Sequence, residues 1–243
     1  MHAVLLNGGY MSKRIIKSVL VVASVLFYSS VFAQSVSPAV LAEYQKLAND
    51  NNVAAQLSLG NFYEKGNGVP ADLVMARSWY LKAATQGDPM AQFNIALFSM
   101  LGKGGPVDKA EAFKWMTLAA EQGFVGAQNN LAIMYDEGNG VTKNAKMAFA
   151  WFEKAANKGS ISAQVNLASM LRTGRGCERD FNQSAIWYRK AAEAGNAAAQ
   201  ERLSYLYSIG QGVPKDMSLS EKWKVLALTA PPAAAAAIAN KAD

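Results

Sequence analysis

The strongest constraint on this chain is an internal repeat of 36 residues that runs without a gap from residue 52 to residue 229. Each of its five copies contains a Gly-x-Gly sequence, and the first four copies close on Ala-Ala-x-x-Gly. A repeat of this length predicts an array of small structural units, each of which buries its apolar face on its neighbours. One tryptophan per copy marks the register: Trp79, Trp115, Trp151, Trp187 and Trp223.

The second half of each copy has the pattern of an amphipathic helix, here called helix B. In the third copy its apolar residues are Ala148, Trp151, Phe152, Ala155 and Ala156, which fall on one face at 3.6 residues per turn. Side chains suited to an N-cap precede the helix in every copy, and a glycine suited to a left-handed C-terminus follows it in four. The N-cap residues are Asp72, Asp108, Asn144, Asp180 and Asp216, with Glu111 and Gln183 placed for capping boxes.

The first half of each copy predicts a second amphipathic helix, helix A, which is joined to helix B by the glycine turn. In the first copy Ala55, Leu59, Phe62 and Tyr63 supply its apolar residues. A column of small residues runs through all five copies, and small residues allow two helix backbones to approach closely. This column consists of Gly60, Ala96, Ala132, Ala168 and Ser204. The predicted unit is therefore helix, glycine turn, helix.

The repeat resembles the Sel1-like repeat of the tetratricopeptide-like superfamily. The resemblance covers residues 52–228 and rests on Ala-Gln, Leu-Gly-x-x-Tyr, Gly-x-Gly-Val, Trp-Tyr and Ala-Ala-x-x-Gly, which the first copy carries between Ala55 and Gly87. It implies an all-α, right-handed solenoid that serves as a scaffold for protein–protein interaction. Cysteine-rich secreted members of this family staple each repeat with disulfides, whereas this chain has one cysteine, Cys177.

The two ends of the chain differ from the repeats. Residues 1–33 read as a secretory signal peptide: Lys13, Arg14 and Lys17 precede an apolar run, and Val31-Phe32-Ala33 fits a cleavage site before Gln34. A membrane anchor is the alternative, but Ser29 and Ser30 interrupt the apolar run. We expect an exported protein, in the periplasm or outside the cell, with no transmembrane segment after cleavage, and the true start could be Met11.

The expected domains follow from this division. Residues 34–51 form a capping helix equivalent to half a repeat, and residues 230–243 form a Pro- and Ala-rich tail that is either a short helix or disordered. The repeats span approximately 52–87, 88–123, 124–159, 160–195 and 196–229.

Composition argues against several functional classes. Loss of the leader leaves 21 Lys and Arg residues against 18 Asp and Glu residues, which lowers the formal charge from +6 to +3, and the basic residues are scattered, so we expect no nucleic-acid partner. His2 is the only histidine and lies in the leader. Without it the chain has no recognisable catalytic base, Ser-x-x-Lys nucleophile or metal cluster, and we expect neither an enzyme nor a cofactor.

The variable side of helix A is the candidate binding surface. In related helix-pair solenoids these positions line the concave face, and in the second copy they are apolar, which is unusual for an exposed surface. We expect a protein or peptide partner to bind there, with Phe93 and Leu97 as anchors; the alternative is that curvature or the N-terminal segment buries these side chains. A second functional hypothesis is a cell-envelope enzyme or binder acting on peptidoglycan or β-lactams. The candidate residues are Met90, Phe93, Leu97, Met100, Leu101 and Ile133, with Asn61, Asn94 and Asn129 at the rim.

Overall fold

The computed structural model describes residues 36–229, which form eleven α-helices and, within that range, no strand. Helix α2 (Pro38–Asn49) precedes the five helix pairs. The helices A are α3 (Val53–Lys65), α5 (Pro89–Leu101), α7 (Val125–Glu137), α9 (Ile161–Thr173) and α11 (Ala197–Ile209). The helices B are α4 (Leu73–Thr85), α6 (Lys109–Glu121), α8 (Ala145–Asn157), α10 (Phe181–Glu193) and α12 (Met217–Thr229).

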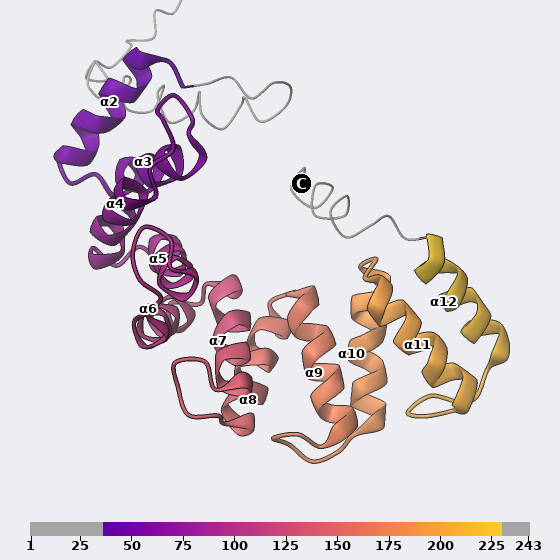
Figure 1. Cartoon of the computed structure of the whole chain (residues 1–243). Coiled ribbons are helices and arrows are strands. Elements are labelled where there is room, and N and C mark those ends of the chain that lie inside the picture. Colours follow the sequence, from indigo (N-terminus) through magenta and orange to yellow (C-terminus); the bar gives the residue numbers. More distant parts are fainter. Residues whose placement is uncertain (1–35, 230–243) are drawn as a thin grey trace, which may run out of the picture.

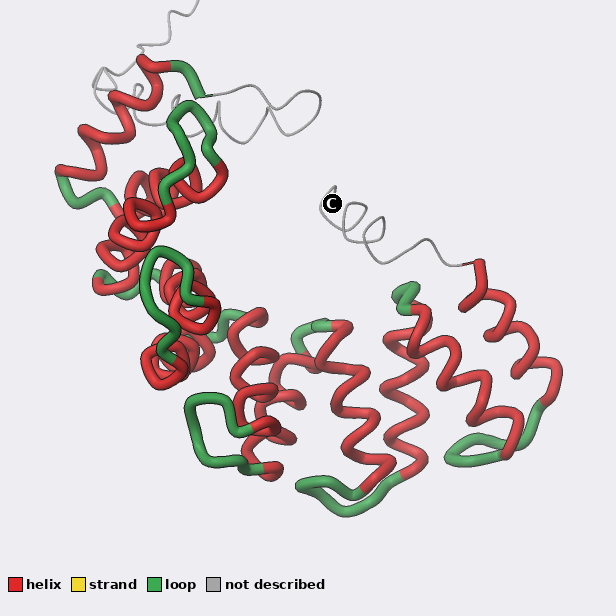
Figure 2. Tube along the Cα trace, viewed as in Figure 1, coloured by secondary structure: helices red, strands yellow, loops and turns green. Residues whose placement is uncertain are grey.

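The helices stack in chain order into a curved solenoid. Each helix packs mainly against the helices just before and after it in sequence. The stack bends into an arc, in which α3, α5 and α7 lie on the inner side and α4, α6 and α8 on the outer side (Figure 1). Short loops join the helices (Figure 2). The all-α solenoid with an N-terminal capping helix is thus confirmed.

The N-caps of helix B are the ones that the sequence predicts. The side chains of Asp72, Asp108, Asn144, Asp180 and Asp216 each accept a hydrogen bond of 2.8–3.1 Å from a backbone N–H of the first helical turn. Their own backbone N–H groups donate to a carbonyl of the preceding helix A at 2.8–2.9 Å. Because these N–H groups are already bonded, the capping boxes expected at Glu111 and Gln183 do not form.

The second glycine of each Gly-x-Gly turn fixes the contact between repeats. Gly140 has a φ of +71°, and a Cβ placed on it would collide with the backbone carbonyl of Lys109 in the preceding repeat. Gly104, Gly176 and Gly212 make the same approach to the first residue of the preceding helix B. Glycine is therefore required here both by its conformation and by the space available.

A ladder of buried glutamines joins each repeat to the one before it. Their side-chain Nε2 atoms donate to the carbonyl of the second alanine of the preceding Ala-Ala pair, or its equivalent Ala48, at 3.0–3.4 Å. Each of these helix-end carbonyls also accepts a backbone N–H from the residue three positions on, as from Gly87 to Ala84 at 3.0 Å, so the glutamine adds a second bond that crosses to the neighbouring repeat. The ladder consists of Gln56, Gln92, Gln128, Gln164 and Gln200.

The core runs along the length of the stack between the two layers of helices. Trp79 and Trp151 are buried in it, whereas Trp115, Trp187 and Trp223 are half-buried, so the tryptophan column is less uniform than its spacing suggests. Among the described residues, no helix combines the length and apolar character that crossing a membrane requires. The predicted signal peptide and C-terminal tail lie outside the described residues.

Candidate functional site on the inner helix face

The candidate residues of the second repeat divide into exposed and half-buried side chains. Met90 and Leu101, at the two ends of α5, are 47% and 60% exposed. Phe93, Leu97 and Met100, between them, are half-buried and pack against the central core, as does Ile133 of α7. The surface therefore offers fewer free apolar groups than the sequence pattern indicates.

The half-buried state of Phe93 has a specific cause in the next repeat. Its ring lies 5.1 Å from the ring of Phe124, measured between centroids. Phe124 stands at the N-cap of α7, where the other helices A carry Asn, Asp or Ser, and it makes no side-chain capping bond. A serine at Phe93 or Leu97 would consequently remove core packing as well as surface, so Met90 and Leu101 are the better positions for testing this face.

A pocket of about 290 Å³ opens beside Met90, between α2, α3, α4 and α5. Three of the candidate residues, Asn61, Met90 and Asn94, line it. Tyr44 of α2 and Tyr80 of α4, which are buried, contribute to its wall together with Phe62. The structure thus brings Asn61 and Asn94 together at one pocket, while Asn129 lies on α7 outside it.

A chain of polar contacts lies next to this pocket. The hydroxyl of Tyr80 donates to Glu64 Oε2 at 3.0 Å, and Lys103 Nζ lies 3.1 Å from Glu64 Oε1. Burial raises the pKa of Glu64, but the hydrogen bonds from Lys103 and Tyr80 and the charge of Lys103 outweigh it and lower the pKa. Burial and then the Glu64 charge raise the pKa of Tyr80, so its hydroxyl stays protonated and neutral.

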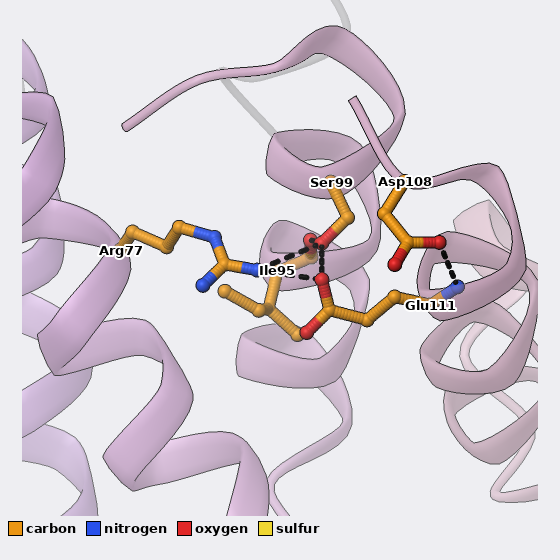
Figure 3. Close-up of polar contacts among 5 residues, drawn as sticks. All are labelled: Arg77, Ile95, Ser99, Asp108 and Glu111. Atoms are coloured by element: carbon orange, nitrogen blue, oxygen red, sulfur yellow. Dashed lines mark hydrogen bonds and ion pairs between the residues drawn. The ribbon is translucent and has the colours of Figure 1, made fainter. Parts of the chain in front are cut away.

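A second polar cluster joins the first two repeats (Figure 3). Arg77 extends from α4 and donates to Glu111 Oε2 of α6 at 2.6 Å, and Ser99 Oγ of α5 lies 2.8 Å from the same oxygen. Asp108 accepts from the backbone N–H of Glu111 at the same helix end. The cluster connects the consecutive helices α4, α5 and α6 through side-chain bonds, so its role is structural.

Two further observations concern metal ligands and the cysteine of residues 36–229. No group of three or more His, Cys, Asp and Glu side chains there could hold a metal ion. Cys177 is half-buried in a glycine turn, within 3.7 Å of the Met170 carbonyl, and burial raises the pKa of its thiol, which disfavours the reactive thiolate. Its environment is that of a small apolar residue.

The sequence analysis missed the aromatic wall of the pocket. Tyr44, Phe62 and Tyr80 stand in core columns of their helices, and periodicity alone places them with the buried residues. Tyr80 reaches the pocket because Gly60 leaves its ring room: a Cβ at that position would overlap the ring. The glycine in a column otherwise filled by alanine or serine is the only signal in the sequence that the wall differs here.

Solved structures with the same fold come from several bacteria. A protective antigen present in uropathogenic Escherichia coli strains is 38% identical, with a TM-score of 0.76, over 78% of this chain and 40% of its own. The chain thus spans less than half the length of that protein. A Sel1 repeat protein from Oxalobacter formigenes is 29% identical, with a TM-score of 0.78, over 90% and 86% of the two chains. An immunity protein from Pseudomonas aeruginosa, 18% identical over 90% and 83% of the two chains with a TM-score of 0.50, shares the fold alone.

No curated protein matches the chain at a significant level. The family model of the Sel1 repeat, in contrast, matches five times, at residues 53–88, 89–124, 125–160, 161–196 and 197–223. These matches cover most of the sequence and follow the helix pairs of the solenoid one by one. Sel1 repeats commonly mediate protein–protein interaction and are generally non-enzymatic. The chain belongs to the Sel1 repeat family.

Proposed function

We propose that this protein is an exported scaffold that binds a protein or peptide partner through the inner face of its helices A. The observation that carries this proposal is the division of each repeat into a constant and a variable part. The constant residues supply caps, turns and core, whereas the inner face changes from apolar in α5, with Met90 and Leu101, to polar in α7 and α9, with Asn129 and Arg172. A surface of this kind suits recognition of a specific partner.

Export is the first part of the proposal, and it rests on the basic, apolar and small-residue regions of residues 11–33. The mature chain then begins at Gln34. N-terminal sequencing of the protein recovered from the cell envelope tests this directly. A leader that is retained in the membrane fraction contradicts it.

Partner binding is tested by affinity capture from envelope extracts with matched variants. Met90→Lys combined with Leu101→Lys places two charges on exposed positions of the inner face. Val74→Lys combined with Met147→Lys does the same on the outer helices, where Val74 is 65% exposed and, like Met90, is the second residue of its helix. Both pairs should keep the helical circular dichroism and the melting temperature of the wild type.

The inner pair should lose the partner that wild type captures, because a lysine in an apolar contact loses hydration without gaining a counter-charge. The outer pair should retain it. Equal capture by both pairs would place the binding surface elsewhere and overturn the proposal.

A further inference from the structure

The pocket beside Met90 has the size of a recess for one side chain. Its volume of about 290 Å³ lies at the lower end of the range for small-molecule sites. Tyr44, Phe62, Tyr80 and Met90 supply rings and a thioether, which suit an apolar group, and the flexible methionine can adapt to its shape.

The pocket disfavours a charged side chain of a ligand. The side chains that line it are all uncharged. Glu64, which bonds to Tyr80 from outside the lining, is already paired with Lys103 at 3.1 Å. A charged side chain that entered would lose its hydration and find no free counter-charge, so the entering group is neutral.

Two side-chain amides stand at the pocket on neighbouring inner helices, Asn61 on α3 and Asn94 on α5. Among the described residues the side chain of Asn94 has no hydrogen-bond partner, although it is half-buried. An amide both donates and accepts, and so does a backbone peptide group. Asn130 and Asn166 repeat the position of Asn94 on α7 and α9, but the Asn130 amide donates to the Gly126 carbonyl of its own helix at 2.8 Å, so it differs from Asn94.

The remaining apolar surface is too limited for a broad helical ligand. A docked amphipathic helix needs several free anchors at helical spacing. Phe93, Leu97 and Met100 are half-buried in contact with the core, which leaves Met90 and the pocket as the accessible apolar part of this half of α5. A single inserted side chain with backbone contacts on either side fits this geometry better.

We infer that the pocket receives one uncharged apolar side chain from an extended segment of the partner, while Asn61 and Asn94 bond to the peptide backbone beside it. This inference rests on the proposed function and assigns the inner face its ligand chemistry. The specificity of the site then comes from the pocket, and the two amides set the direction and register of the bound segment.

The test uses peptides selected from a phage-displayed library of random dodecapeptides against the purified chain. The tightest binder is synthesised with a fluorescent label, and its Kd is measured by fluorescence polarisation. Selected peptides should share an apolar residue at one position. Replacing that residue by aspartate, or methylating the backbone nitrogen next to it, should weaken binding by about tenfold or more, which corresponds to one lost contact.

The protein variants Asn94→Ala and Met90→Lys should weaken the same peptide by about tenfold, and the matched outer variant Val74→Lys should leave its Kd unchanged. Peptides without a shared apolar residue, a Kd that neither inner variant changes, or a gain of helical circular dichroism on binding would each overturn the inference. A library that yields no binder also overturns the inference. If the double variant Met90→Lys/Leu101→Lys nevertheless loses the envelope partner, the proposed function stands. The partner then binds as a folded surface rather than as an extended segment.

Discussion

At the scale of single residues, the second glycine of the turn and the closing glycine of the third repeat have different surroundings. Gly140, with a φ of +71°, lies against the backbone of Lys109, whereas Gly159, with a φ of +89°, has no atom within 4 Å of the position that a Cβ would take. Both need the left-handed conformation, which disfavours other residues. The contact between repeats thus adds a steric requirement at Gly140 that Gly159 lacks.

The two glycines should respond differently to alanine. Gly159→Ala should cost about 1–2 kcal/mol, the strain of a left-handed alanine. Gly140→Ala should cost about 1–3 kcal/mol more, because the new Cβ forces the neighbouring backbone to move. Urea denaturation of the two variants measures the difference in the free energy of unfolding. Equal losses would show that the approach of the two repeats at Gly140 is not tight.

Glu64 gives one residue-scale dependence on pH. Its pKa in the folded chain lies below the usual value for glutamate, about 4.5, so the folded state binds its proton less readily than the unfolded state does. Its stabilising contribution is therefore complete above that value and is lost as the pH falls through the lowered pKa. The difference in unfolding free energy between wild type and Glu64→Gln should shrink as the pH falls below about 4.5. A difference that stays constant down to acid pH would contradict the assigned ion pair with Lys103.

At the scale of helices, polar side chains reinforce the junctions that the repeat pattern builds. Arg77, Ser99 and Glu111 connect α4, α5 and α6 of the first two repeats (Figure 3). The corresponding junction one repeat later is apolar: Phe113 and Tyr135, in the columns of Arg77 and Ser99, pack edge to face at 5.4 Å between ring centroids. The same junction therefore accepts either a polar cluster or an aromatic pair.

A double-mutant cycle measures this junction. Arg77→Met and Glu111→Gln, singly and together, should give a coupling free energy of about 1 kcal/mol, since both side chains are more than two-thirds buried. The exposed pair Glu221 and Lys224, 3.6 Å apart within α12, is the control and should give a coupling close to zero. Similar couplings in both cycles would mean that the cluster of Figure 3 adds no more than a surface ion pair.

Helix starts and stops were predictable because they depend on local chemistry, as at Asp72 and Asp180, whereas contacts between helices were harder to foresee. The glutamine that follows each helix A alanine, such as Gln92, looked like a family signature, and its bond to Ala84 requires the packed arrangement of two repeats. The burial of Phe93 depends in the same way on Phe124. An aromatic residue in an N-cap column is the signal in the sequence that marked this exception.

At the scale of the whole molecule, residues 36–229 form a stack whose strong contacts join helices adjacent in sequence. Each repeat contacts its neighbours in sequence, and the described part of the stack ends at α12, where Val225 and Leu228 are exposed. Stability in such an array is approximately a sum over repeats and their interfaces. A core residue between two repeats therefore contributes more to the free energy of unfolding than the equivalent residue in α12.

The tryptophan column offers a test of this picture. Trp151 is buried, and Lys154 Nζ lies 3.8 Å from the centroid of its ring. Its replacement by alanine should lower the free energy of unfolding by about 3–5 kcal/mol. The same replacement at Trp223, which is half-buried in α12, should lower the free energy of unfolding by less. Guanidinium denaturation followed by circular dichroism compares the two variants, and equal losses would argue against the nearest-neighbour description.

Methionine methyl resonances report directly on whether a partner binds on the inner face beside the pocket. Met90 and Met100 lie on inner helix α5, whereas Met147 and Met217 are exposed on the helices B α8 and α12. With ¹³C-methyl methionine, titration of the captured partner should shift the Met90 and Met100 signals and leave those of Met147 and Met217 in place. Shifts at Met147 or Met217, with Met90 unchanged, would contradict binding of the partner to the inner face.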